Sequence, residues 1–239
     1  MIERRIDVRT RDGEMPTFVL HPTHEGPHPV VLYLMDAPSI RPALKDMASR
    51  LATAGYYVML PYLYYRGGPY REFGQSDEDM HARRELMDTV SPASIVVDAE
   101  ALLAVADDDP AAASGDVGVV GFCMSGGLAI SLAKALPERV AAAASIHGAW
   151  IVRETPDSPH VGLKPVRAEV YMAWVDNDPT APPEHIPVMR EALDEAGVRH
   201  TIDVITDAVH GFAPAGERYD RNASELHWER VHALFRRNL

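Results

Sequence analysis

Short apolar runs alternate with helix-like segments from residue 29 to residue 239, and this alternation restricts the fold more than any other feature. Near-continuous apolar runs are typical of strands buried on both faces of a parallel sheet. Strands are predicted at 29–35, 56–60, 118–121, 140–146, 168–175 and 200–205. Helices are predicted at 41–54, 77–89, 91–107, 124–135, 184–196 and 223–237. The pattern predicts an α/β protein with a mostly parallel central sheet and helices on both faces.

The N-terminal segment has a different pattern. Residues 2–9 and 15–21 are β-like and flank an Asp12-Gly13 pair, which predicts an antiparallel hairpin at one end of the sheet. Loops are predicted at 61–76 and 107–115, and an irregular segment at 150–167. A length of 239 residues fits one domain, so we expect residues 1–239 to form a single unit.

Charge and cysteine content exclude several classes of protein. The chain has 23 basic and 35 acidic residues, a formal net charge of −12, which disfavours binding to nucleic acid. It has one cysteine, no apolar signal segment at its start and no apolar stretch near the roughly 20 residues of a membrane span. Without a metal-ligand motif or a phosphate loop, no metal or cofactor is expected. We expect a cytoplasmic protein, monomeric or weakly homo-oligomeric, that binds neither membrane nor nucleic acid.

The single cysteine, Cys123, follows an apolar strand and precedes a helix rich in small residues. The string Gly121-Phe-Cys-Met-Ser-Gly-Gly127 matches the nucleophile turn of the α/β-hydrolase fold, with Cys in place of Ser. Small neighbours give this strained turn the room it needs, and the following helix N-terminus favours a thiolate. The same string could instead place Ser125 as the nucleophile, but Cys123 would then occupy the position that needs glycine.

A cysteine nucleophile needs a base and an acid that orients it. His210 lies in the loop after the last predicted strand, next to Gly211, and is the preferred base. Asp176 and Asp178 follow the preceding strand; Asp178 lies further into the loop, before Pro179, and is preferred as the acid. His147 also follows a strand and is expected to line the site without a catalytic role.

Two backbone N–H groups are expected to form the oxyanion hole, the site that stabilises the negatively charged oxygen of the intermediate. Met124 follows the nucleophile directly and provides one donor. The other is expected from Ala37, in the loop after the strand at 29–35. Tyr64 and Tyr65, in the tyrosine-rich loop at 61–76, either shape the acyl pocket or only cover the edge of the sheet.

From about residue 29 onward the sequence resembles the dienelactone hydrolases (carboxymethylenebutenolidases). The matching segments are Gly121–Gly127, Asn177–Pro182, His210–Phe212, Met35–Pro38, and Trp228 with Leu234-Phe235. The resemblance implies an α/β-hydrolase fold, a triad of Cys123, His210 and Asp178, and hydrolysis of enol lactones or esters without a cofactor.

Three residues or groups depart from the family pattern. Ser125 precedes the Gly-Gly pair, and Asp36 replaces a Glu that takes part in ionising the thiol in this family. Asp36 either performs that role with a different reach or is structural. Family arginines that bind a substrate carboxylate have no secure counterpart, although Arg83 and Arg84 are candidates.

These features predict a cysteine-dependent hydrolase of enol lactones or activated esters that forms a covalent thioester. Two alternatives stay open at this point. One is a serine esterase that uses Ser125, and the other is a non-catalytic binding protein built on the hydrolase scaffold.

Overall fold

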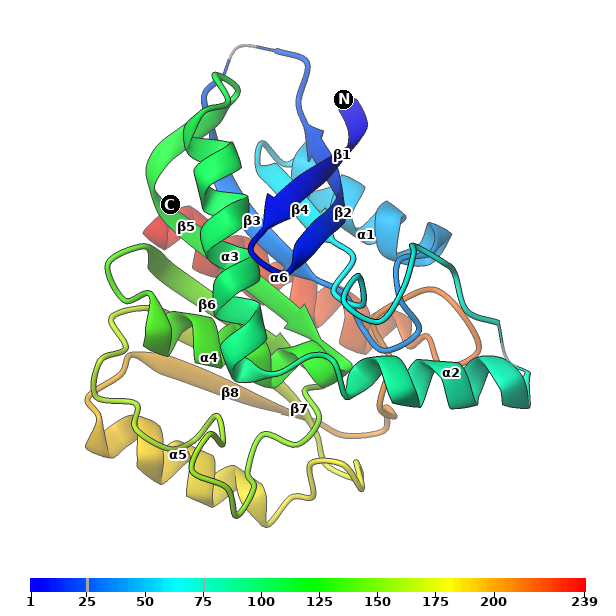
Figure 1. The fold of residues 1–239 in the computed structure, drawn as a ribbon. Coiled ribbons are helices and arrows are strands. Elements are labelled where there is room, and N and C mark those ends of the chain that lie inside the picture. The colour runs from blue at the N-terminus through cyan, green and yellow to red at the C-terminus, as the bar shows by residue number, and fades with distance from the viewer. Residues whose placement is uncertain (25, 75) are drawn as a thin grey trace. The chain divides into compact units, whose positions relative to one another are not determined.

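The structure, a computed structural model, describes residues 1–24, 26–74 and 76–239. It divides into two compact units, Met1–Gly115 and Asp116–Leu239. Figure 1 labels their helices and strands. Strand β5 (Ala112–Phe122) crosses the boundary between them. Among the described residues no single helix is long and apolar enough to cross a membrane. Helices α2 (Asp77–Met87) and α3 (Pro92–Asp107) meet that criterion only as a pair bent by 83°.

The N-terminal unit contains four further strands and three helices. The strands are β1 (Ile2–Thr10), β2 (Gly13–His21), β3 (His28–Leu34) and β4 (Tyr57–Pro61). The helices are α1 (Pro42–Thr53), α2 (Asp77–Met87) and α3 (Pro92–Asp107). The strand order is β1-β2-β4-β3, with β1–β2 and β2–β4 antiparallel and β3–β4 parallel. The predicted hairpin is therefore confirmed, and Thr10 pairs with Gly13 at its turn.

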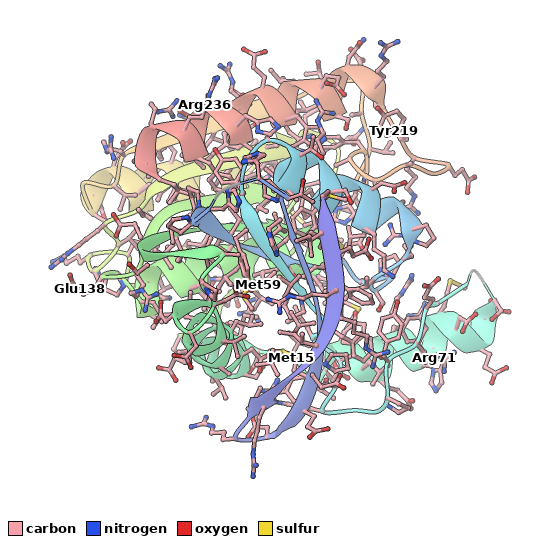
Figure 2. All side chains as sticks on the ribbon, turned by 90° about the horizontal axis from the view of Figure 1, so that it is seen from above. Met15, Met59, Arg71, Glu138, Tyr219 and Arg236 are labelled. Atoms are coloured by element: carbon pink, nitrogen blue, oxygen red, sulfur yellow. The ribbon has the colours of Figure 1, made fainter. Side chains whose placement is uncertain are left out.

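Side chains from β2 and β4 form much of the core of this unit. Met15 and Met59 are fully buried; both are labelled in Figure 2. Helix α3 begins with a capping box, in which the Ser91 and Ser94 side chains accept from each other's backbone N–H. Helix α1 packs on β2 and β4, and α3 packs on β1.

The C-terminal unit contains four parallel strands in the order β5-β6-β7-β8. Its strands after β5 are β6 (Val140–Ile146), β7 (Glu169–Val175) and β8 (His200–Ile205). Its helical segments are η1 (Cys123–Ser125), α4 (Gly126–Ala135), α5 (His185–Glu195) and α6 (Arg221–Asn238). The predicted parallel strands are confirmed in this unit.

Helices α4 and α6 cover opposite faces of the C-terminal strands (Figure 1). A Cβ on Gly118 would lie 2.8 Å from the Phe235 ring of α6, and Gly118 pairs with Ala142 of β6. A Cβ on Gly126 of α4 would lie 2.5 Å from Ser145 Oγ, three residues further along β6. Successive strand residues point to opposite faces of the sheet, so Ala142 and Ser145, three residues apart, lie on opposite faces. Helix α6 therefore lies on the Ala142 side and helix α4 on the Ser145 side.

Most predicted bounds differ from the structure by one or two residues, and two of the differences have a clear physical cause. Strand β5 begins at Ala112, within the segment predicted as a connector. The prediction missed this start because Ser114, Gly115 and Asp116 are exposed and interrupt the apolar pattern of the strand. The helix predicted to begin at residue 124 is preceded by the short 3-10 turn η1, and the α-helix starts at Gly126. The left-handed backbone of Cys123 requires this tight turn.

Candidate functional site

Cys123 lies where β5 turns sharply into η1, and its backbone has a φ of 54°. Residues other than glycine rarely adopt this left-handed conformation, which is concentrated at functional sites. The side chain is partly exposed, whereas Phe122 before it is fully buried. The turn therefore presents the thiol outward from the end of a buried strand, as a nucleophile turn does.

Glycine is required on both sides of this turn. A Cβ on Gly121 would lie 2.0 Å from the carbonyl oxygen of Ser125, and a Cβ on Gly126 would lie 2.6 Å from the Cα of Gly148. Both obstacles are backbone atoms, so a small shift of a side chain could not remove them. The expectation that small residues surround Cys123 because the turn is tight is confirmed.

Ser125 has none of these features. Its side chain is completely buried and its φ is −89°, an ordinary right-handed value. The exposed, strained position in the string is that of Cys123.

Asp178 and His210 come together from the loops after β7 and β8. The Nδ1–H of His210 donates to Oδ2 of Asp178 over 2.5 Å. The other carboxylate oxygen, Oδ1, accepts from the backbone N–H and the hydroxyl of Thr180, at 2.8 and 2.7 Å. Asp178 is 2% exposed, so its carboxylate is held in a fixed direction by three donors. Asp176, the other predicted acid, continues the strand instead, and its N–H donates to the carbonyl of Ile205.

The charge state of His210 follows from these contacts. Burial of the ring would lower its pKa, but hydrogen bonds with Asp178 and Cys123 outweigh burial and raise the pKa to about 10. Since Nδ1 is bonded to Asp178, Nε2 is left for the thiol of Cys123. The pKa of Asp178 is lowered: burial raises it, and the hydrogen bonds from His210 and Thr180 more than offset this. The structure thus brings Cys123, His210 and Asp178 into one hydrogen-bonded series.

His147 follows β6 and lies against His210. The two rings meet edge to face with centroids 5.2 Å apart, and Phe212 lies 5.1 Å from the His147 ring. His147 is 1% exposed, and among the described residues neither of its ring nitrogens has a hydrogen-bond partner. Burial lowers its pKa well below 6.5, and the nearby His210 and His227 lower it further. The ring is neutral and makes apolar contacts.

His147 and His210 should give stability opposite dependences on pH. His147 binds protons more weakly in the folded state than in the unfolded state, so it lowers the free energy of unfolding as pH falls below about 6.5. His210 binds its proton more strongly when folded. Its stabilisation is complete below about pH 6.5 and is lost as pH rises toward 10.

We expect His147→Phe to reduce the loss of stability at acid pH, because the phenyl ring fills similar space and cannot bind a proton. The measurement is Tm at several values between about pH 7 and pH 5, where only the His147 contribution should differ between variant and wild type. His81→Gln, at an exposed position on α2, is the control and should keep the wild-type slope. Parallel curves for His147→Phe and wild type would contradict the expectation.

Four predicted site residues belong to the N-terminal unit. Asp36 is 4% exposed, and both of its carboxylate oxygens accept from Arg41, at 2.6 and 2.9 Å. The backbone of Ala37, the next residue, is buried, and its carbonyl accepts from the hydroxyl of Tyr64 over 2.9 Å. Tyr64 therefore fixes the loop that carries Ala37.

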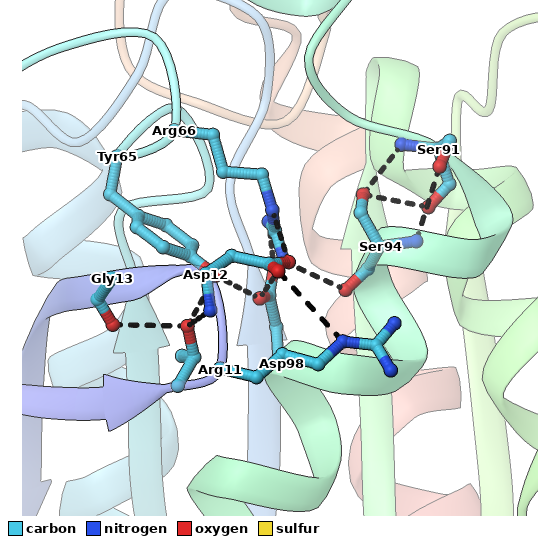
Figure 3. A network of polar contacts seen from close by, with 9 residues as sticks. Arg11, Asp12, Gly13, Tyr65, Arg66, Ser91, Ser94 and Asp98 are labelled. Carbon is cyan, nitrogen blue, oxygen red and sulfur yellow. Dashed lines mark hydrogen bonds and ion pairs between the residues drawn. The ribbon is translucent and has the colours of Figure 1, made fainter.

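Tyr65 belongs to a buried polar network (Figure 3). Its hydroxyl donates to Asp98 over 2.7 Å and lies 2.8 Å from the hydroxyl of Thr10. Arg66 contacts both oxygens of Asp98, at 2.7 and 3.0 Å, and also contacts Asp12 in the hairpin turn. The network ties the tyrosine-rich loop to α3 and to the hairpin, which is a structural role.

The candidate carboxylate-binding arginines lie on α2. Arg83 is half-buried and Arg84 is exposed. In residues 1–24, 26–74 and 76–239, no group of three or more His, Cys, Asp or Glu side chains could hold a metal ion.

The sequence did not indicate two supports of the site. Thr180 holds Asp178; a Thr two residues after an Asp is a turn pattern that could have suggested it. The loop after β6 is the other support: Ala149 N–H donates to the carbonyl of Cys123, and Trp150 N–H donates to the carbonyl of Thr180, each over 2.9 Å. These are backbone contacts, which no side-chain pattern reveals.

Three known proteins are similar to this chain over nearly its whole length. A Synechocystis protein that is provisionally named a carboxymethylenebutenolidase is 29% identical over 238 residues, covering 98% of this chain and 96% of its own. Two solved structures have the same fold. One, from Klebsiella pneumoniae and provisionally described as a dienelactone hydrolase, has a TM-score of 0.87 at 23% identity and covers 98% of both chains.

The other structure, dienelactone hydrolase from Anabaena variabilis, has a TM-score of 0.73 at 19% identity and covers 100% of this chain and 98% of its own. The model of the dienelactone hydrolase family matches residues 15–239, nearly the whole chain. With the α/β-hydrolase fold and these relatives, the chain belongs to the dienelactone hydrolase family and is a hydrolase of ester bonds.

Proposed function

We propose that the chain is a cysteine-dependent hydrolase of enol lactones or activated esters, with Cys123, His210 and Asp178 as its triad. The observation that carries the proposal is the left-handed, partly exposed Cys123, hydrogen-bonded to a histidine that is itself bonded to a buried carboxylate. The complete burial of the Ser125 side chain supports Cys123 over Ser125 as the nucleophile.

The reaction proceeds in two stages. The thiolate of Cys123 attacks the carbonyl carbon, and the oxygen of the tetrahedral intermediate accepts from the N–H of Met124. The C–O bond of the ester then breaks, and Nε2 of His210 donates its proton to the departing oxygen. Water attacks the thioester while His210 takes one of its protons, which releases the acid and restores Cys123.

The nucleophile limits the substrate. A thiolate is a better leaving group than an ordinary alkoxide, so an intermediate with an alkoxide would tend to expel Cys123 and return to substrate. An enolate or a phenolate leaves more readily, which favours enol lactones and activated esters as substrates. The two bonds from Arg41 support a structural role for Asp36, because they occupy both carboxylate oxygens.

The test is intact mass spectrometry after brief exposure to p-nitrophenyl acetate and to a panel of enol lactones. We expect an acyl adduct on Cys123 in the wild type and in Ser125→Ala, and none in Cys123→Ala. Iodoacetamide should label Cys123 and abolish activity, because the thiol is partly exposed and lies beside His210. An adduct on Ser125, or full activity in Cys123→Ala, would refute the proposed nucleophile.

A further inference from the structure

The loop after β6 places Trp150 between two parts of the triad. The preceding residue, Ala149, is bonded through its N–H to the carbonyl of Cys123. Trp150 itself is bonded through its N–H to the carbonyl of Thr180, whose side chain holds Asp178. The backbone at Trp150 is therefore fixed relative to both the nucleophile turn and the loop of the acid.

Trp150 has a left-handed backbone, with a φ of 52°. This conformation is unfavourable for a bulky side chain, and glycine or asparagine would adopt it more readily. Among the described residues of the C-terminal unit, the other non-glycine residues with positive φ are Cys123, His147 and Asp207. They follow β5, β6 and β8, so the strained residues gather at the end of the sheet that carries the triad.

Packing does not explain a tryptophan at this position. The Trp150 side chain is 45% exposed, whereas its neighbours Ala149 and Ile151 are 3% and 1% exposed. Ile151 packs toward α4, where its Cδ1 lies 3.7 Å from the Cβ position of Gly127. A large apolar residue that is 45% exposed and disfavoured by its backbone is not an ordinary core residue, and strain of this kind is retained at functional sites.

We propose that Trp150 determines substrate specificity by offering its indole face to a planar, conjugated acyl group of the substrate. Aromatic and conjugated groups stack favourably on indole, and the exposed ring supplies that surface beside the nucleophile and acid loops. This inference rests on the proposed function and adds to it the class of acyl group that is preferred.

The experiment compares vinyl cinnamate with vinyl acetate, which share an enol leaving group and differ only in the acyl part. We expect Trp150→Gly to lower kcat/KM for the cinnamate by about tenfold and to change that for the acetate by less than about twofold. Because glycine relieves the left-handed backbone, Tm should be unchanged or higher. Trp150→Phe should restore most of the preference for cinnamate without a gain in Tm.

Asp207→Gly is the matched control, because it relieves the same kind of backbone strain without removing an aromatic ring. It should leave the ratio of the two kcat/KM values as in the wild type. An equal loss on both esters in Trp150→Gly, or an unchanged ratio, would overturn the specificity role. Failure of the proposed function is distinguishable, since the wild type would then form no acyl adduct on Cys123 with either ester.

Discussion

Asp178→Asn should lower the rate of Cys123 acylation by roughly 10²–10⁴-fold and leave the fold intact. The carboxylate accepts the Nδ1–H of His210 and so leaves Nε2 facing the thiol. An amide can offer an N–H to Nδ1 instead, which would hold His210 in the wrong tautomer. Stopped-flow measurement of p-nitrophenolate release gives the acylation rate directly.

Asp176→Asn is the matched control for that experiment. Asp176 lies two residues earlier in the same loop and is half-buried, but its backbone continues the pairing of β7 with β8 through Ile205. We expect it to lower the rate by about tenfold or less. A large loss in Asp176→Asn together with a small loss in Asp178→Asn would reverse the assignment of the acid.

His210→Ala should abolish both acylation and turnover, a loss of roughly 10⁴-fold or more, because the variant loses the group that pairs with the thiol and later activates water. His147→Ala removes the neighbouring ring, 5.2 Å away, and should keep most of the activity. Burst amplitude and steady-state rate with p-nitrophenyl acetate measure the two stages separately. Equal losses in the two variants would mean that the base is not His210.

The sequence predicts buried strands well, because burial on both faces produces continuous apolar runs. Strands β6, β7 and β8 were predicted within one residue of their bounds for this reason. The start of β5 escaped prediction because Ser114, Gly115 and Asp116 are exposed and interrupt its apolar pattern. The mostly exposed strand β1 was predicted by a different signal, the Asp12-Gly13 turn that follows it.

In the candidate site, features that depend on residue type could be predicted from the sequence, whereas features of the backbone conformation could not. Cys123 could be found because its strained turn requires glycine at Gly121, and that requirement is visible in the sequence. The left-handed backbones of His147 and Trp150 could not be found, because neither residue type suggests such a conformation. The sequence favoured Asp178 over Asp176 because of its position in the loop and because of the resemblance to the dienelactone hydrolases. In the structure, Asp178 is the carboxylate that accepts from His210.

Cys123, Asp178 and His210 each follow a different strand, β5, β7 and β8, and the register of those strands fixes the distances between them. The first residues of the loops after β6 and β7 hold the side chains in place through Ala149 and Thr180. Insertions or deletions in the segment 152–167, which lies between the Trp150 loop and β7, can therefore accumulate during evolution without separating the triad. Descendants of one ancestral hydrolase can thus acquire different substrates by exchanging surface loops around an unchanged reaction centre.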